Sequence, residues 1–192
     1  MSIEVTRPEL TELAEASLKR AAESFGFMIK EEVTVSEISI QNIEPDGKWG
    51  DLVADSMYLL TTEMIGDMKG KSYLLFDKEI ANQVFYLCTG LKVGDTSLTV
   101  DVVLKEIDNI LSASMISEIA DKLKVTIYGD VPYCYDYTKD QIKTTVNNDL
   151  KNYHVDSEQY LINCNLNTSK SNLVVHFFWV LSGDMVKKLE TK

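Results

Sequence analysis

The 192-residue sequence predicts an α+β fold, a single pseudo-symmetric duplicated domain in which two long helices pack on one face of an antiparallel β-sheet. Three observations predict this fold. Residues 9–30 and 102–124 read as long helices, the first because apolar and small side chains recur there at three- and four-residue spacing. Runs rich in β-branched and aromatic residues follow each helix and are separated by turn residues. The same order of elements occurs twice, which favours an internal duplication.

The first half continues from its long helix into three expected strands. These lie at residues 33–40, 52–65 and 72–76. The turn Glu44-Pro45-Asp46-Gly47 ends the first strand, and the polar link 66–71 joins the other two strands as a hairpin. Asp77 is expected to cap a following helix, which Gly90 ends.

The second half repeats this order with a polar helical insertion. Further strands are expected at residues 125–128, 132–135, 159–166 and 172–181, with a polar helix at 138–152 and a terminal helix from Asp184. Residues 72–79 and 176–183 resemble each other because each strand runs directly into the start of a helix. We therefore predict one domain over residues 1–192 with a degenerate repeat, about 9–90 and 100–192.

Charge and cysteine usage limit the class of partner and the compartment. The 30 acidic residues exceed the 19 basic ones, and a net charge of -11 opposes binding to nucleic acid or to an anionic membrane. A basic or receptor-like partner fits this balance better. Three cysteines without a C-x-x-C pair fit free thiols in a reducing cytosol. The uncharged stretch 171–183 is too short to span a bilayer, so we expect a cytoplasmic protein without membrane insertion.

Most candidate motifs favour ordinary structure over chemistry. Residues 66–72 have one residue too few between their glycines for a phosphate-binding loop, and a strand follows them, so they predict a hairpin turn. His154, Asp156 and Glu158 alternate as metal ligands could, but an acidic loop that enters a strand explains them better. With two histidines and no G-x-S-x-G, the sequence gives no support for nucleophilic catalysis.

Glu106 and Asn109 are the remaining candidates, and they are three residues apart on the second long helix. Their side chains should project from one side, opposite a core-facing stripe made of Leu104, Ile107, Leu111 and Met115. We expect a surface site, because the small side chain of Ala113, one turn further on, leaves room for a partner to approach this face of the helix. A carboxylate can bind a partner's lysine, and an amide can position a water for attack on a phosphoryl group.

Chance is the competing explanation for this pair. Glu79 and Asn82 form a second Glu-x-x-Asn, and an ordinary solvated helix face accounts for such pairs without any function. Context distinguishes the two pairs. Glu106-Ile107-Asp108-Asn109-Ile110-Leu111 is followed, twenty-two residues after Asn109, by Pro132, whereas Lys105 stands at the corresponding place after Asn82.

This run resembles the active helix of the CheC/CheX/FliY family of CheY-phosphate phosphatases in bacterial chemotaxis. That family's pattern is Asp or Ser, three residues, Glu, two residues, Asn, twenty-two residues, Pro, with Glu-Ile-Gly-Asn-Ile-Leu at its centre. The chain departs from it at the first position, which holds Val102, with Asp101 adjacent. On the first helix Leu18 stands where a second catalytic Asn would be, so that site is predicted to be inactive. The resemblance spans most of the chain and implies a CheC-like fold with one intact active helix.

The resemblance also implies the reaction, hydrolysis of the aspartyl-phosphate on a CheY-like response regulator in two-component signalling. Asn109 would orient the attacking water, and Glu106 would bind the regulator's active-site lysine, with Asp101 and Pro132 as supporting residues. We expect no cofactor or metal bound by this chain, since the Mg²⁺ belongs to the regulator. The alternative is a noncatalytic binding or adaptor module of chemotaxis or the flagellar switch, which binds CheY, the receptor deamidase CheD or its own copy as a homodimer.

Overall fold

The computed structural model describes residues 3–4, 7–43, 56–153 and 158–190. Its elements are β1 (Ile3–Glu4), α1 (Pro8–Ile29), β2 (Val33–Ile43), β3 (Ser56–Gly66), β4 (Gly70–Asp77), α2 (Lys78–Thr89), α3 (Val100–Leu123), β5 (Ile127–Gly129), β6 (Tyr133–Thr138), α4 (Lys139–Tyr153), β7 (Gln159–Thr168), β8 (Val174–Ser182) and α5 (Gly183–Glu190). The predicted turn at residues 44–47, the start of the strand predicted at 52–65, and His154 and Asp156 lie outside the described residues.

All the strands join one antiparallel sheet in the order β1-β2-β7-β8-β4-β3, and β5 and β6 both pair with the outer edge of β3. The central pair, β4 and β8, brings the two halves of the sequence together, with Leu74 opposite Phe177. The first half's β2 pairs with the second half's β7, and the second half's β6 pairs with β3. Each half therefore completes the sheet of the other. The predicted duplication would give this pattern, and the duplication itself stays a prediction.

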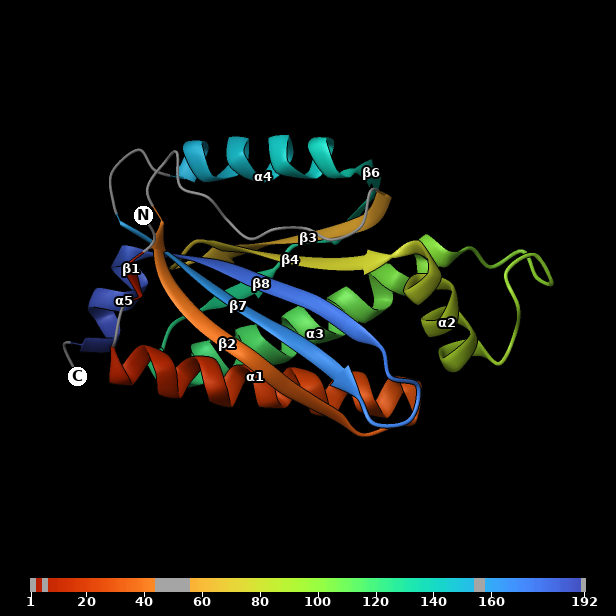
Figure 1. Cartoon of the computed structure of the whole chain (residues 1–192). Coiled ribbons are helices and arrows are strands. Elements are labelled where there is room, and N and C mark those ends of the chain that lie inside the picture. Colours follow the sequence, from red (N-terminus) through yellow and green to blue (C-terminus); the bar gives the residue numbers. More distant parts are fainter. Residues whose placement is uncertain (1–2, 5–6, 44–55, 154–157, 191–192) are drawn as a thin grey trace.

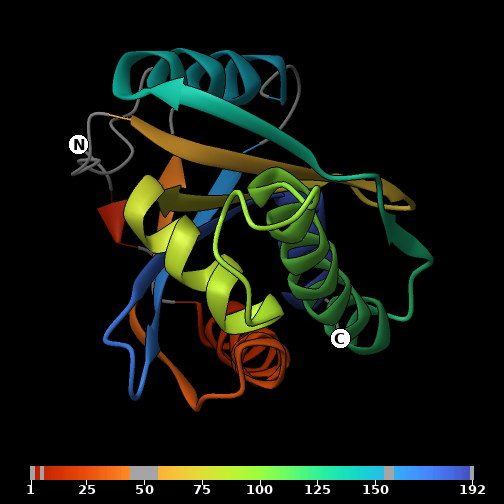
Figure 2. The same cartoon turned by 90° about the vertical axis from the view of Figure 1, so that its right-hand side faces the viewer.

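The long helices α1 and α3 lie side by side on one face of this sheet (Figures 1 and 2). Both bury apolar side chains at helical spacing, and these merge into one core with the sheet. Polar contacts tie the two helices together along their length: Ser24 with Ser114 at 2.8 Å, Arg20 with Glu118 at 3.2 Å and Lys122 with Glu12 at 2.7 Å. The predicted packing of two long helices on one face of an antiparallel sheet is confirmed.

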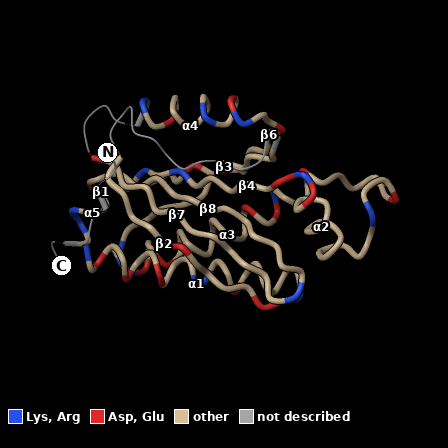
Figure 3. The backbone as a smooth tube through the Cα atoms, in the orientation of Figure 1, with Lys and Arg blue, Asp and Glu red and all other residues tan. Residues whose placement is uncertain are grey.

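Helix α4 covers the opposite face of the sheet (Figure 1). Its residues Ile142, Val146 and Leu150, four positions apart, are buried against a second core on that face. Lys71 of β4 reaches Asp149 of α4 at 2.8 Å, which fixes the helix to the sheet. Basic and acidic positions are mixed along α4 (Figure 3), as expected where the other side of a helix faces water. Within the described part of the chain, every helix is too short or too polar to cross a membrane.

Local signals explain where the elements next to α3 begin and end. Asp77 accepts a hydrogen bond from the backbone N–H of Glu79 at 2.7 Å, and Gly90 ends α2 with φ 73°, as predicted. Lys124 ends α3 in a left-handed conformation with φ 55°. Strand β6 begins at Tyr133, one residue later than predicted, because Pro132 has no N–H to donate to a strand ladder.

Candidate functional site

Helix α3 presents a narrow exposed stripe to the surface. Its members follow one another at intervals of three or four residues: Val102, Glu106, Asn109, Ala113 and Ser117. The opposite side is fully buried, with Leu104, Ile107, Leu111 and Met115 all at 0% exposure. The structure thus places Glu106 and Asn109 on the same outer face. Their roles in any reaction stay predictions.

Glu106 is available to a partner. Within the described part of the chain, its carboxylate has no ion pair or hydrogen bond to its own protein. Asn109 lies one turn further along on the same side, and the small side chain of Ala113 follows it. Neither the Glu106 carboxylate nor the Asn109 amide has a partner among the described residues, so a protein that lies along this stripe meets both groups, with no bulky side chain immediately after them.

Asp101 does not occupy the stripe. It lies beside Val102 and forms an ion pair with Lys105 at 3.4 Å, one helical turn away. Hydrogen bonds from Thr99 and Lys105 lower the pKa of the Asp101 carboxyl. Val102 takes the stripe position instead and is 49% exposed. An exposed apolar side chain therefore occupies the first position of the family pattern in this chain. Asp101 instead contacts Thr99 and Lys105 in the first turns of the helix.

Pro132 is buried and directly precedes β6. Two residues later, Cys134 lies close enough to Asp101, Lys105 and Asp108 for their charges to affect its thiol, whose pKa burial raises to about 12. The structure therefore brings the Pro132 segment alongside the N-terminal half of α3. A buried proline can shape this segment, but it offers no surface to a partner.

The first helix carries no equivalent surface. Glu15 is exposed on α1, but Leu18, three residues later, is 1% exposed and belongs to the core. A side chain at position 18 therefore cannot reach a partner in the way that Asn109 can. The prediction that α1 carries no second active site stays a prediction.

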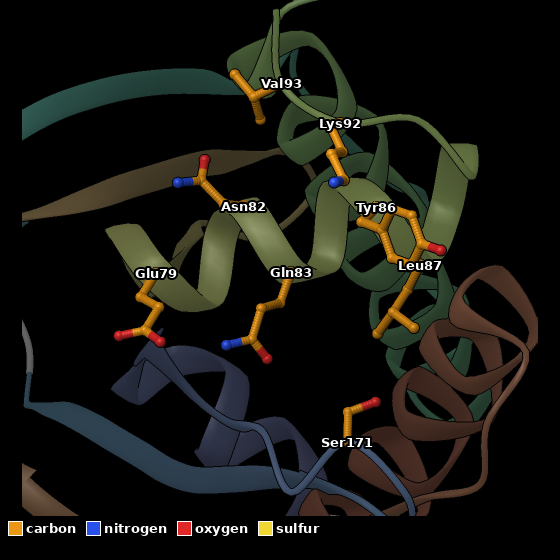
Figure 4. A pocket seen from close by; sticks show the side chains of 8 residues that line it. All are labelled: Glu79, Asn82, Gln83, Tyr86, Leu87, Lys92, Val93 and Ser171. Carbon is orange, nitrogen blue, oxygen red and sulfur yellow. The ribbon is translucent and has the colours of Figure 1, made fainter. Parts of the chain in front are cut away.

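The second Glu-x-x-Asn lies in a different place, at a hollow beside α2. This pocket has a volume of about 480 Å³ and is lined by Glu79, Asn82, Gln83, Tyr86, Leu87, Lys92, Val93 and Ser171. Figure 4 shows the Asn82 amide and the Glu79 carboxylate pointing to different sides of the helix. These two groups do not converge on one reacting atom, and the pocket does not include the α3 stripe.

A buried polar layer lies beneath the stripe, and the sequence patterns did not predict it. Asp108 is 0% exposed and accepts a hydrogen bond from the Thr62 hydroxyl at 2.6 Å. Ser112, one turn later, pairs with Ser72 at 2.9 Å. Burial raises the pKa of Asp108 to about 7. The sequence offers one indication that Asp108 is buried: it directly follows Ile107, which belongs to the core-facing stripe of the helix.

Comparisons with known proteins give matches at the level of structure. No protein-family model and no curated protein matches the sequence. FliY from Thermotoga maritima superposes with a TM-score of 0.70 at 16% identity, over 97% of this chain and 96% of that chain. A chain of the CheX-CheY-BeF3-Mg²⁺ complex from Borrelia burgdorferi gives 0.57 at 13% identity, over 88% and 96%. A chain of the FliG-FliM complex from H. pylori gives 0.60 at 9% identity, over 98% and 100%.

The fold therefore falls in the α+β class that these chemotaxis and Fli proteins share. More particularly, it is the fold of FliY and CheX, so the CheC-like fold implied by the resemblance is confirmed. At sequence identities of 16% and below, these similarities establish the fold of this chain but not its activity.

Proposed function

We propose that this chain is a cytoplasmic chemotaxis phosphatase that hydrolyses the aspartyl-phosphate of a CheY-like response regulator. One observation carries the proposal: Glu106 and Asn109 share the exposed stripe of α3, in a fold that CheX has. The CheX structure is a complex with CheY, which supports a CheY-like partner for the same fold.

Glu106 serves as the docking group in this proposal. A regulator with an active-site lysine offers an ammonium to a carboxylate that has no partner within the described residues of its own chain. Once the interface excludes water, this charge-assisted contact strengthens and fixes the register of the two proteins. The docking contact therefore brings Asn109, one turn along α3, to the phosphoryl group.

Asn109 acts by positioning. Its amide can accept a hydrogen bond from a water and donate one to a phosphoryl oxygen, but it cannot take up a proton. The positioned water forms a new P–O bond while the bond to the aspartyl oxygen breaks, which releases phosphate and the free carboxylate. The proton of the water leaves with the phosphate product. A Mg²⁺ held by the regulator would neutralise charge on the phosphoryl group, and we assign no metal to this chain.

The test is the lifetime of a phosphorylated CheY-like receiver, with Mg²⁺ present and with or without this chain. We expect faster loss of the phosphoryl group with the wild type and little acceleration with Asn109→Ala. Asn82→Ala on α2 is a matched control, because it removes the same amide from the other Glu-x-x-Asn. Equal acceleration by wild type and Asn109→Ala would contradict the assignment of Asn109.

A noncatalytic binding module is the second candidate, and Val102 favours it. This side chain is 49% exposed at the first position of the stripe, where it can make apolar contacts but no hydrogen bond. The fold is also that of a chain in the FliG-FliM complex. Under this alternative the chain binds CheY, CheD or a second copy of itself. Stable binding of a phosphorylated receiver with an unchanged phosphoryl lifetime would decide for it.

A further inference from the structure

Asp108 directly precedes Asn109 in the sequence and faces the core, whereas Asn109 faces the surface. Its carboxylate is fully buried. Oδ2 accepts the hydrogen bond from Thr62 of β3, and Oδ1 has no hydrogen-bond partner among the described residues. A glycine stands at this position in the family pattern that the run resembles. The buried carboxyl is thus a feature of this chain, located one residue from the proposed water-positioning amide.

A second polar contact accompanies the first. Ser112 lies one turn after Asp108 and pairs with Ser72 of β4 at 2.9 Å. Thr62 and Ser72 stand directly opposite each other in the β3–β4 ladder. The apolar side chains of α3 attract the sheet without a preferred direction, whereas hydrogen bonds depend on geometry. The apolar stripe sets which face of α3 meets the sheet, and these two contacts further restrict the rotation of the helix about its own axis at the turn that carries Asn109.

No cation faces Asp108 within the described part of the chain. Burial and the Thr62 hydrogen bond account for the shift of the Asp108 pKa, without a contribution from a neighbouring charge. Several cations on the neighbouring elements form ion pairs elsewhere: Lys105 with Asp101, Arg20 with Glu118, Lys122 with Glu12, Lys78 with Asp136, and Lys71 with Glu63 and Asp149. The β6 thiol of Cys134 stays neutral, because burial raises its pKa to about 12. Tyr128 of β5 is exposed.

Protonation decides whether this arrangement is favourable. A neutral Asp108 accepts the Thr62 bond without burying a charge. An ionised Asp108 is a buried anion with one unpartnered oxygen, which is costly unless water enters or the helix turn moves. Burial raises the pKa of Asp108 to about 7, so both forms are present near neutral pH.

We infer that Asp108 is a positioning residue: its protonated form, bonded to Thr62, holds α3 in the rotation that presents Asn109, and its ionisation loosens that turn. The coupling between Asp108 and Asn109 is a property of the free protein. Its effect on phosphate hydrolysis rests on the proposed function.

The coupling is tested by NMR on the ¹⁵N-labelled full chain without any partner, between pH 5.5 and 8.5. We expect the Asn109 side-chain amide signals of the wild type to move with a midpoint near pH 7. Asp108→Asn has the same shape, cannot ionise and can still accept the Thr62 bond, so its Asn109 signals should stay in place. Asp121→Asn, which removes an exposed carboxylate from the same helix, should keep the wild-type titration.

A wild type whose Asn109 signals do not move, or an Asp108→Asn variant whose signals still move, would overturn the inference. Thr62→Val provides a second test if Asp108→Asn does not fold. It removes the donor that lowers the pKa of Asp108, so the midpoint should shift to higher pH. An unchanged midpoint in Thr62→Val would also count against the coupling.

Activity supplies the functional readout. If only protonated Asp108 presents Asn109 correctly, the rate of dephosphorylation, corrected for the receiver's own decay, should fall about tenfold from pH 6 to pH 8. Asp108→Asn should remove this fall. A chain that shows the NMR titration but no phosphatase activity refutes the proposed function alone. An active chain with a flat Asn109 titration refutes the coupling alone.

Discussion

Asp108 and Asn109 are adjacent in the sequence, yet Asp108 faces the core and Asn109 faces the surface of α3. Asp108 lies at 0% exposure against Thr62 of the sheet, and Asn109 lies on the exposed stripe with Glu106. Each residue of an α-helix turns by about 100°, so an inward and an outward side chain share one stretch of rigid backbone. The orientation of Asn109 therefore depends on how firmly the buried contacts of α3, including the Asp108–Thr62 hydrogen bond, hold the helix.

Asn109→Ala should abolish most of the proposed activity while the fold is retained. The change removes the amide that positions water, and alanine has the higher helix propensity, so stability should not fall. If positioning and its hydrogen bond supply a few kcal/mol, dephosphorylation should slow by about a hundredfold or more. The measurement is the decay of receiver phosphate, with circular dichroism as the check on folding. Full activity in this variant would exclude Asn109 as the catalytic group.

Glu106→Ala and Glu15→Ala should differ, because only α3 carries an amide on the same face as its glutamate. Loss of Glu106 removes a charge-assisted contact, so the Kd for the receiver should rise by about tenfold or more. Glu15 lies on α1 beside the buried Leu18 and should be replaceable with little effect. Titration of each variant with labelled receiver measures both constants. Equal losses would mean that the two halves are functionally alike.

Much of the fold could be predicted from periodicity. The helical patterns at residues 9–30 and 102–124 place α1 and α3 within two residues of their observed ends. Asp77 and Gly90 fix α2 by local capping chemistry, which depends only on neighbouring residues. The face that carries Glu106 and Asn109 follows from the same periodicity, because four apolar residues define the buried side.

The polar layer beneath the site could not be predicted in this way. Asp108 meets Thr62, which is 46 residues away in the sequence, and Ser112 meets Ser72, 40 residues away. Sequence patterns assign charged residues to water, and only the pairing of β3 with β4 under α3 makes the inward position polar. The packing of α4 against the sheet could not be predicted for a related reason. Its three buried residues form only a narrow apolar stripe, and the sheet surface that they cover is made of strands from both halves of the chain.

Asp149→Ala should destabilise the protein without acting on the α3 stripe. Lys71 has an 11% exposed side chain and lies 2.8 Å from Asp149, with Glu63 further away at 3.7 Å. Removing the nearer carboxylate leaves a largely buried ammonium poorly compensated, which should cost about 3 kcal/mol of unfolding free energy. Urea denaturation measures this loss. Asp136→Ala is the control, because its pair with Lys78 is about half exposed to solvent and should contribute much less to stability than the Lys71–Asp149 pair.

The pH dependence of stability tests Asp108 without any partner. Its pKa rises from 3.8 to about 7 on folding, so between these values the folded protein holds a proton that the unfolded chain has released. Stability from this group is complete below pH 4, declines as the pH rises, and reaches its lowest level above pH 7. Asp108→Asn cannot titrate and lacks this decline.

The unfolding free energy of Asp108→Asn minus that of the wild type should therefore rise by about 4 kcal/mol between pH 4 and pH 8, as an upper limit for a shift of this size. Taking the difference cancels the other carboxyl groups, including Asp101 and Glu31, whose lowered pKa values act in the opposite direction at lower pH. Urea denaturation at each pH gives both free energies. A difference that stays constant across this range would mean that Asp108 is ionised in the folded protein throughout, and that the hydrogen bond from Thr62 is enough to hold its charge.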